Sequence, residues 1–359
     1  MNKIAELISR LCPDGVEFKT LDSLVSYVQP GPYIVSSTEY DAHYSTPVLT
    51  AGQSFILGYT NEEEGIYNAS SQKPVIIFDD FTTSFHWVDF DFKVKSSALK
   101  ILKMKDKQEA DFRYIYMAMK TIHFIPTNHI RHWISLYSKF EIPLPPLNIQ
   151  KEIVSILDSF TSLIDKMKQE VEMRKKQMEY YLNILICKDN VAARLFGDIG
   201  VVQRGKRVVR KELALQGCIP VFQNSLTPLG YYQYSNIPAN NTFIISAGTA
   251  GEIGFSAKPF WAADDCLVIS SVLCDSKYLY YYLKTQEQFL KSQIRGGAMK
   301  RLSRETIEKL EIPVPSLEKQ RQIASILDSF ETYISKLEKM IELRQKQYEY
   351  YREKLLTFE

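Results

Sequence analysis

A duplication constrains the fold of this 359-residue chain more than any other feature. Residues 141–186 read EIPLPPLNIQKEIVSILDSFTSLIDKMKQEVEMRKKQMEYYLNILI, and residues 311–356 read EIPVPSLEKQRQIASILDSFETYISKLEKMIELRQKQYEYYREKLL. The two segments are identical at about half of their positions, without a gap, at a constant offset of 170 residues. Such a repeat indicates that the chain contains two copies of one structural unit.

Each copy begins with prolines, which cannot continue a helix, and then runs on without glycine or proline. The pattern predicts helices over 148–188 and 317–359. Apolar residues alternate at spacings of four and three over more than four heptads, which is typical of a coiled-coil seam. Arg174 and Arg344 are polar exceptions at the same heptad position. The seam residues are Ile153, Leu157, Phe160, Ile164, Met167, Val171 and Met178 in the first copy, and Ile323, Leu327, Phe330, Ile334, Leu337, Ile341 and Tyr348 in the second.

Two similar seams in one chain favour pairing with each other, and an intermolecular coiled coil is the alternative. An antiparallel pair would place the domain before each helix at opposite ends of the pair. We therefore expect an antiparallel coiled coil.

The blocks before the helices, residues 1–147 and 189–316, mix short β-rich segments, turns and a late helix at 111–120 or 277–290. Strand-like runs occur in both, PVIIF at 74–78 and NTFIIS at 241–246. The predicted fold is α+β, with two pseudo-symmetric domains joined by two long helices. An amphipathic helix at 2–11 is expected to pack beside the C-terminal helix and close the repeat.

The sequence offers no convincing catalytic motif. Residues 200–206 match G-x-x-x-x-G-K, but Arg207 stands where a nucleotide-binding loop needs a Ser or Thr to bind magnesium. Residues 248–254 have G-x-x-G-x-x-G spacing, which is not the dinucleotide fingerprint and predicts a turn. Asp79-Asp80 and Asp264-Asp265 are interpreted as acids at strand ends.

Metal and disulfide sites are not indicated either. The histidines at 123, 129 and 132 lack the H-E-x-x-H spacing of a zinc helix, and the five cysteines form no C-x-x-C pair. The first residues show no long apolar core followed by a small-residue cleavage site, so no signal peptide is expected, and no apolar run approaches the roughly 18 residues of a membrane span. We expect a cytoplasmic protein without metal.

The charge of the chain is unevenly distributed. The total is +2, but residues 1–147 carry 14 basic and 17 acidic residues, whereas residues 189–316 carry 15 and 11. The second domain combines two basic runs with glycines and amides, a combination that favours DNA contact. The candidate DNA-binding residues of the first run are Arg204, Lys206, Arg207, Arg210 and Lys211, and those of the second run are Lys300, Arg301 and Arg304. Between the two runs lie the candidates Gln223, Asn224 and Ser225. In the first domain Asn128, Arg131 and His132 take the place of the second run.

The proline turns (EIPLPPLNIQ, EIPVPSLEKQ), the I-L-D-S-F and Q-x-E-Y-Y motifs and the stretches CPDGVEFKTL and FWAADDC resemble the DNA specificity subunit of type I restriction-modification systems. The resemblance implies a non-catalytic subunit whose two target-recognition domains each read half of a bipartite site in double-stranded DNA. It also implies two methyltransferase subunits, which carry S-adenosylmethionine and methylate adenine N6. Restriction subunits that use ATP and Mg can join them.

The resemblance also implies that the paired helices set the unspecified gap between the two half-sites, and their length is consistent with this role. The seam from Ile153 to Leu185 covers about 32 residues, or roughly 48 Å, against about 34 Å per DNA turn. Two alternatives compete with this interpretation: a coiled-coil adaptor that does not contact DNA, and an ATP-dependent DNA enzyme that rests on the incomplete G-x-x-x-x-G-K.

Overall fold

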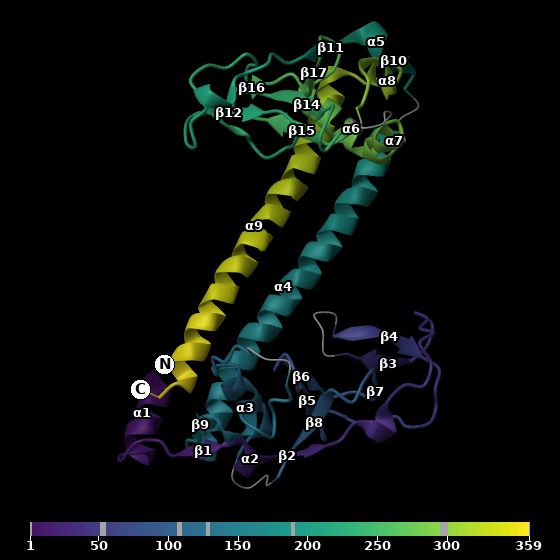
Figure 1. Cartoon of the computed structure of the whole chain (residues 1–359). Helices are drawn as coiled ribbons and strands as arrows, with labels where there is room; N and C mark the ends of the chain where they lie inside the picture. The colour runs from purple at the N-terminus through teal and green to yellow at the C-terminus, as the bar shows by residue number, and fades with distance from the viewer. Residues whose placement is uncertain are drawn as a thin grey trace. The chain divides into compact units, whose positions relative to one another are not determined.

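The computed structural model describes residues 2–50, 55–105, 110–126, 130–187, 191–294 and 301–358. The chain forms two compact units, residues 1–166 with 341–359, and residues 167–340 (Figure 1). Two long helices, α4 (Leu147–Cys187) and α9 (Leu317–Leu356), each contribute one part to each unit. No helix in these described ranges is long and apolar enough to cross a membrane.

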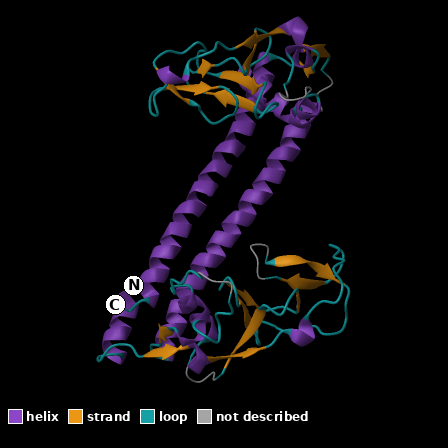
Figure 2. Ribbon diagram, viewed as in Figure 1, coloured by secondary structure: helices purple, strands orange, loops and turns teal. Residues whose placement is uncertain are grey.

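Within the residues that the structure describes, the strands of the first unit form three sheets (Figure 2). Their strand orders are β2-β8-β5-β6, β4-β3-β7 and β1-β9, and every pairing is antiparallel except β3 with β7. Besides the parts of α4 and α9, the elements are α1 (Asn2–Leu11), β1 (Phe18–Thr20), α2 (Leu21–Leu24), β2 (Val25–Val28), η1 (Gly31–Tyr33), β3 (Thr46–Leu49), β4 (Ile56–Thr60), β5 (Val75–Asp79), β6 (Phe85–Val88), β7 (Lys93–Val94), β8 (Leu99–Met104), α3 (Phe112–Met119), η2 (Tyr137–Lys139) and β9 (Glu141–Pro143).

The second unit repeats this topology. Its sheet orders are β11-β17-β14-β15, β13-β12-β16 and β10-β18, and β12 with β16 is again the parallel pair. The duplication predicted from the helices therefore extends to the domains. The elements are β10 (Ala193–Leu195), α5 (Phe196–Ile199), β11 (Gly200–Arg204), η3 (Arg210–Glu212), β12 (Ile219–Phe222), β13 (Gly230–Tyr232), β14 (Asn241–Ile245), β15 (Ile253–Ser256), β16 (Trp261–Ala262), β17 (Cys266–Ser271), α6 (Ser276–Thr285), α7 (Glu287–Ser292), α8 (Arg304–Glu308) and β18 (Glu311–Pro313).

The central strand β5 is buried along its whole length, as its continuous apolar run predicts. Ile76 and Phe78 point into one hydrophobic cluster with α3 and the start of α4, whereas Val75 and Ile77 point into a second cluster beneath the smaller sheet. In β14, Ile244 points into one hydrophobic cluster of the second unit, whereas Phe243 and Ile245 point into another. Each domain therefore has two cores, one on each side of its larger sheet.

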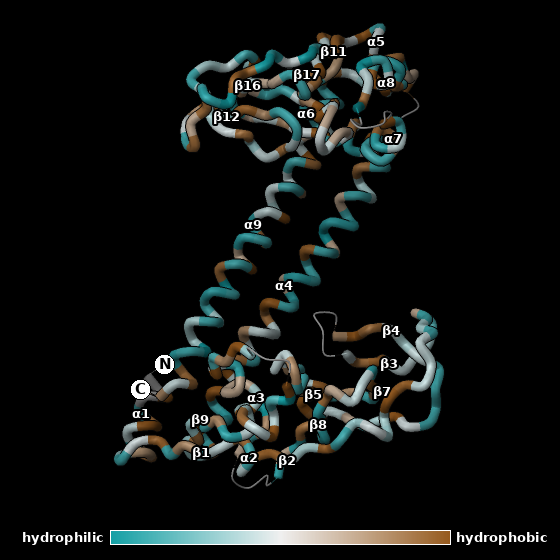
Figure 3. The backbone as a smooth tube through the Cα atoms, viewed as in Figure 1, coloured by the Kyte–Doolittle hydropathy of each residue, from teal (hydrophilic) through white to brown (hydrophobic). Residues whose placement is uncertain are grey.

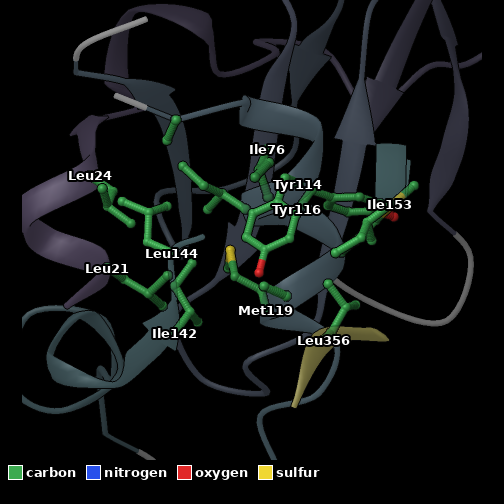
Figure 4. Close-up of a cluster of buried hydrophobic side chains, with 14 of the residues drawn as sticks. Leu21, Leu24, Ile76, Tyr114, Tyr116, Met119, Ile142, Leu144, Ile153 and Leu356 are labelled. Carbon is green, nitrogen blue, oxygen red and sulfur yellow. The ribbon is translucent and has the colours of Figure 1, made fainter. Parts of the chain in front are cut away.

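The first of these cores also holds the two ends of the chain. Ile4 of α1 and Leu356 of α9 are both buried in the cluster that contains Tyr114 and Ile153. Figure 4 shows Leu356, Tyr114 and Ile153 in this cluster. The expected packing of the N-terminal helix beside the C-terminal helix is confirmed. In the second unit the end of α4 takes this place, with Ile186 buried beside Ile323 and Leu327.

The long helices pair antiparallel in each unit. In the second unit the Tyr181 and Phe330 rings lie 5.6 Å apart and Lys175 Nζ lies 2.9 Å from Glu338 Oε1, so the residue number rises along one helix as it falls along the other. In the first unit the Phe160 and Tyr351 rings lie 5.5 Å apart, and because both helices are continuous they keep this direction. The seam residues predicted above are buried or half-buried. Apolar and polar residues alternate along both helices (Figure 3).

One predicted helix is wrong in its extent. The expected helix at 277–290 is two helices, because α6 ends at Thr285 and α7 begins at Glu287. Gln286 joins them with φ −94° and ψ 1°, outside helical geometry. Because no glycine or proline marks the break, the sequence pattern did not reveal it.

Candidate nucleic-acid interface

A basic loop follows strand β11 in the second unit. The backbone N–H of Gly205 donates to Cys266 O at 2.9 Å, and that of Lys206 donates to Ala262 O at 2.9 Å. A Cβ on Gly205 would lie 2.1 Å from Ala263 O, so the close approach requires glycine. The loop is therefore fixed to the β16–β17 connection, and it exposes Lys206 and Arg207 to solvent.

Two further contacts hold this loop. The Trp261 indole Nε1 donates to Lys206 O at 2.8 Å, and Arg204 Nε donates to the backbone oxygen of Asp264 at 2.7 Å. Arg210 and Lys211 lie beyond the loop on η3 and are exposed. The neighbouring Glu212 accepts a hydrogen bond from Tyr232 Oη at 3.0 Å, which raises the pKa of that phenol.

The amide residues Gln223 and Asn224 follow strand β12. Asn224 O accepts a hydrogen bond from the backbone N–H of Thr249 at 2.9 Å. Gly248, which has a φ of +84°, packs closely against Asn224. Gln223 Nε2 lies 3.5 Å from Asp264 Oδ1. Ser225 Oγ donates to Thr227 O at 3.1 Å.

Arg301 comes from the second basic run. Its backbone forms an isolated antiparallel β-bridge with Ala247. Its Nη2 lies 3.3 Å from Asp265 Oδ1, and the two groups form an ion pair that lacks the geometry of a hydrogen bond. Arg304 is exposed and pairs with Glu308. Lys300 lies outside the described residues. The structure thus gathers Arg204, Gln223 and Arg301 around the turn that contains Asp264 and Asp265.

The first unit has an equivalent of Arg301. The backbone N–H of His132 donates to Asp80 O at 2.8 Å, just as the N–H of Leu302 donates to Ser246 O at 2.9 Å. Arg131 therefore takes the place of Arg301, as predicted from the sequence. His132 itself is 3% exposed and packs edge-on against Phe124, so its side chain lies in the core and is left out of the interface. Asn128 lies outside the described residues.

The two units differ in where they place charge. In the first, Lys100 and Asp80 are fully buried with Nζ and Oδ2 3.3 Å apart, and Asp80 Oδ1 accepts the Trp133 N–H at 2.8 Å. In the second, Leu267 occupies the strand position of Lys100. The Arg301–Asp265 pair of the second unit is partly exposed instead. The first domain therefore buries a lysine and an aspartate at positions where the second domain has Leu267 and Ser246.

The glycine motifs of the second unit have structural roles. Gly200–Arg204 is strand β11 rather than a loop around phosphate, and Gly248 and Gly251 form the β14–β15 turn at positive φ. Burial raises the pKa of the Cys266 thiol to about 12, so it is protonated at neutral pH. Within the part of the chain that the structure describes, no group of three or more His, Cys, Asp or Glu residues could hold a metal ion.

The long helices carry a second kind of candidate site, because each unit has a groove along one of them and the two grooves share three repeat positions. In the first unit an open groove of about 280 Å³ is lined by Ser155, Ile156, Ser159, Phe160 and Leu163. In the second, a groove of about 590 Å³ includes Ser325, Ser329 and Tyr333, which are the repeat partners of Ser155, Ser159 and Leu163. Leu163 and Tyr333 are exposed in both.

Other exposed apolar residues follow the same repeat. Met173 and Leu343 are matched at the offset of 170, as are Tyr180 and Tyr350, and each of the four is at least 57% exposed. These exposed apolar positions therefore recur in both copies of the repeat.

Comparison with known proteins places these features in a family. The model of the type I restriction modification DNA specificity domain matches residues 13–173 and 189–345. The specificity subunit of the type I restriction enzyme EcoR124I/EcoR124II from Escherichia coli is 36% identical, over 96% of this chain and 95% of its own.

Solved structures share the fold. The S subunit of a type I restriction-modification system from M. genitalium superimposes with a TM-score of 0.71 over 95% of this chain and 96% of its own, at 18% identity. A chain from a type I system assembly aligns with a TM-score of 0.53 over 96% of this chain and 97% of its own, at 13% identity.

Proposed function

Because this chain belongs to the type I restriction-modification DNA specificity family, we propose that each of its domains reads one half of a bipartite, asymmetric DNA site. The observation that carries the proposal is the repeated topology of two domains that differ in sequence and in charge. Two similar scaffolds with different surfaces can present two different sets of contacts to DNA. The family match also favours DNA recognition over an adaptor that does not contact DNA.

The long helices set the distance between the half-sites in this proposal. At about 1.5 Å per residue, the 41 residues of α4 measure about 61 Å, against about 34 Å for one turn of DNA. The packed Phe160–Tyr351 and Tyr181–Phe330 pairs support a fixed register between the helices. A fixed register would make the length of the unspecified gap a property of this chain.

The partners in this proposal are two methyltransferase subunits. The three repeat positions shared by the two grooves and the repeated exposed residues Met173, Leu343, Tyr180 and Tyr350 support two docking sites of one kind. Those subunits supply S-adenosylmethionine and methylate adenine N6, and restriction subunits supply the reactions that need ATP and Mg. In this division of labour our chain contributes recognition alone.

Methylation mapping tests the proposal. The methyltransferase subunits are expressed with and without this chain in a host that lacks other adenine methylation, and methylated adenines are mapped across the genome. We expect methylation at one bipartite sequence, dependent on the chain. Methylation at a continuous motif, or methylation that does not depend on the chain, would contradict the proposal.

A further inference from the structure

The turn between β16 and β17, residues 263–265, contacts segments that are far apart in sequence. The turn is closed by the Cys266 N–H, which donates to Ala263 O at 3.0 Å. Around it lie the end of β11 with Arg204, the end of β12 with Gln223, the end of β14 and the segment of Arg301. The sequence suggested only strand-end acids here, yet three of these four segments carry candidate DNA-binding residues.

Asp264 holds two of those residues. Its backbone oxygen accepts Arg204 Nε at 2.7 Å, and its carboxylate faces the Gln223 amide at 3.5 Å. The backbone of the adjacent Asp265 is held by Ser246, which donates to Asp265 O through both its backbone N–H, at 2.8 Å, and its Oγ, at 3.0 Å. The backbone of the turn that carries the Asp264 carboxylate is therefore held by the framework of the second domain.

The carboxylate determines which way the Gln223 amide faces. An ionised carboxylate only accepts hydrogen bonds, so it attracts the NH₂ end of a carboxamide and repels the oxygen end. Gln223 is thereby left with its Oε1 and one N–H available to a ligand. In the major groove, adenine presents the matching pair, an N6–H donor and an N7 acceptor.

We propose that Asp264 is a positioning residue that orients the Gln223 amide to read an adenine in the half-site of the second domain. This inference rests on the proposed function and deepens it. Asp264 also places a negative charge beside Arg204 and next in sequence to Asp265, the partner of Arg301, where it opposes binding to phosphate. Asp264 therefore lowers affinity for DNA in general while it raises discrimination at one base pair.

The test uses the assembled complex of this chain with its methyltransferase subunits. Binding is measured for the mapped target and for duplexes in which each base pair of the half-site is changed in turn. We expect Asp264→Asn to lose about tenfold in discrimination at one A·T pair and to bind unrelated DNA more tightly. Gln223→Ala should lose discrimination at the same pair, and the double variant should lose no more than Gln223→Ala alone.

Two controls separate positioning from folding. Asp264→Glu keeps the carboxylate and should restore most of the discrimination. Asp198→Asn removes the same charge from an exposed site on α5 of the same domain and should change neither specificity nor affinity at the target. The thermal unfolding midpoint is measured for every variant.

The outcomes are distinguishable. Unchanged discrimination in Asp264→Asn, or equal losses at every base pair, would overturn the role of Asp264 while DNA recognition by the chain stood. Additive losses in the double variant would also overturn it. If the wild-type complex showed no preference for any sequence, the proposed function would fall, and this inference with it.

Discussion

The Phe160 ring of α4 lies 5.5 Å from the Tyr351 ring of α9, and both residues recur in the other copy of the repeat. Phe330, the repeat of Phe160, lies 5.6 Å from Tyr181, the repeat of Tyr351. The same pair is thus built twice with the roles of the two helices exchanged. An antiparallel pair of duplicated helices produces this exchange, whereas a parallel pair would match each residue with its own copy.

Removing either ring should weaken the helix pair. Phe160→Ala and Phe330→Ala each delete a half-buried aromatic contact, and we expect each to lower the free energy of unfolding by about 2 kcal/mol. Urea unfolding followed by circular dichroism measures the change. Leu343→Ala, at an exposed position of α9, should stay within about 0.5 kcal/mol of the wild type. A smaller effect of the phenylalanine variants than of this control would contradict the pairing.

A buried glutamine connects each long helix to its domain. Gln150 Oε1 accepts the Asp111 N–H at 2.8 Å while its Nε2 donates to Pro145 O at 2.7 Å, and Gln320 repeats both contacts with Asp275 and Pro315. Gln150→Leu removes this partner from both backbone groups, and we expect a loss of about 2 to 3 kcal/mol. Unfolding measurements on this variant and on Gln169→Leu, an exposed control on the same helix, provide the comparison. Equal stability of the two variants would refute the role of Gln150.

The basic loop should govern affinity rather than specificity. Lys206→Ala with Arg207→Ala removes two exposed cations, so binding should weaken for target and unrelated DNA alike. The slope of log affinity against log salt should become shallower by up to about 1.8, at about 0.9 per lost phosphate contact. Fluorescence anisotropy over a salt series measures both quantities. A loss confined to the target sequence would argue against phosphate contact.

Lengthening the helices should lengthen the recognised gap. Inserting one heptad into α4 and one into α9 preserves the seam and adds about 10.5 Å, which corresponds to about three base pairs. Methylation mapping should then show both half-sites unchanged and the gap about three base pairs longer. An unchanged gap would show that the helices do not set it.

The two helix grooves predict how many methyltransferase subunits the complex contains. Leu163→Asp places a charge in the groove of the first unit and should cost this chain one of two methyltransferase subunits, as measured by native mass spectrometry. Tyr333→Asp should have the equivalent effect in the second unit, and the double variant should bind neither subunit. Two retained subunits in the double variant would place the docking sites elsewhere.

The sequence predicted the features that depend on local periodicity. The 4-3 pattern and the proline turns were sufficient for α4 and α9, and the offset of 170 residues was sufficient for the repeat. The burial of His132 was missed because a histidine beside an arginine resembles a surface site. The backbone N–H of His132 donates to the carbonyl of Asp80, 52 residues away, and this contact holds His132 in the core. The contacts of Asp264 were missed for the same reason, since they join strand ends that are distant in sequence.

The indole of Trp261 lies against the backbone of the basic loop through its bond to Lys206 O. The other two tryptophans of the chain, Trp87 and Trp133, belong to the first unit. The second domain therefore carries its own intrinsic fluorophore. With Trp87 and Trp133 replaced by phenylalanine, the tryptophan fluorescence of this chain would report DNA binding by the second domain alone. Stopped-flow measurements could then determine, without an added dye, the order in which the two halves of a target are bound.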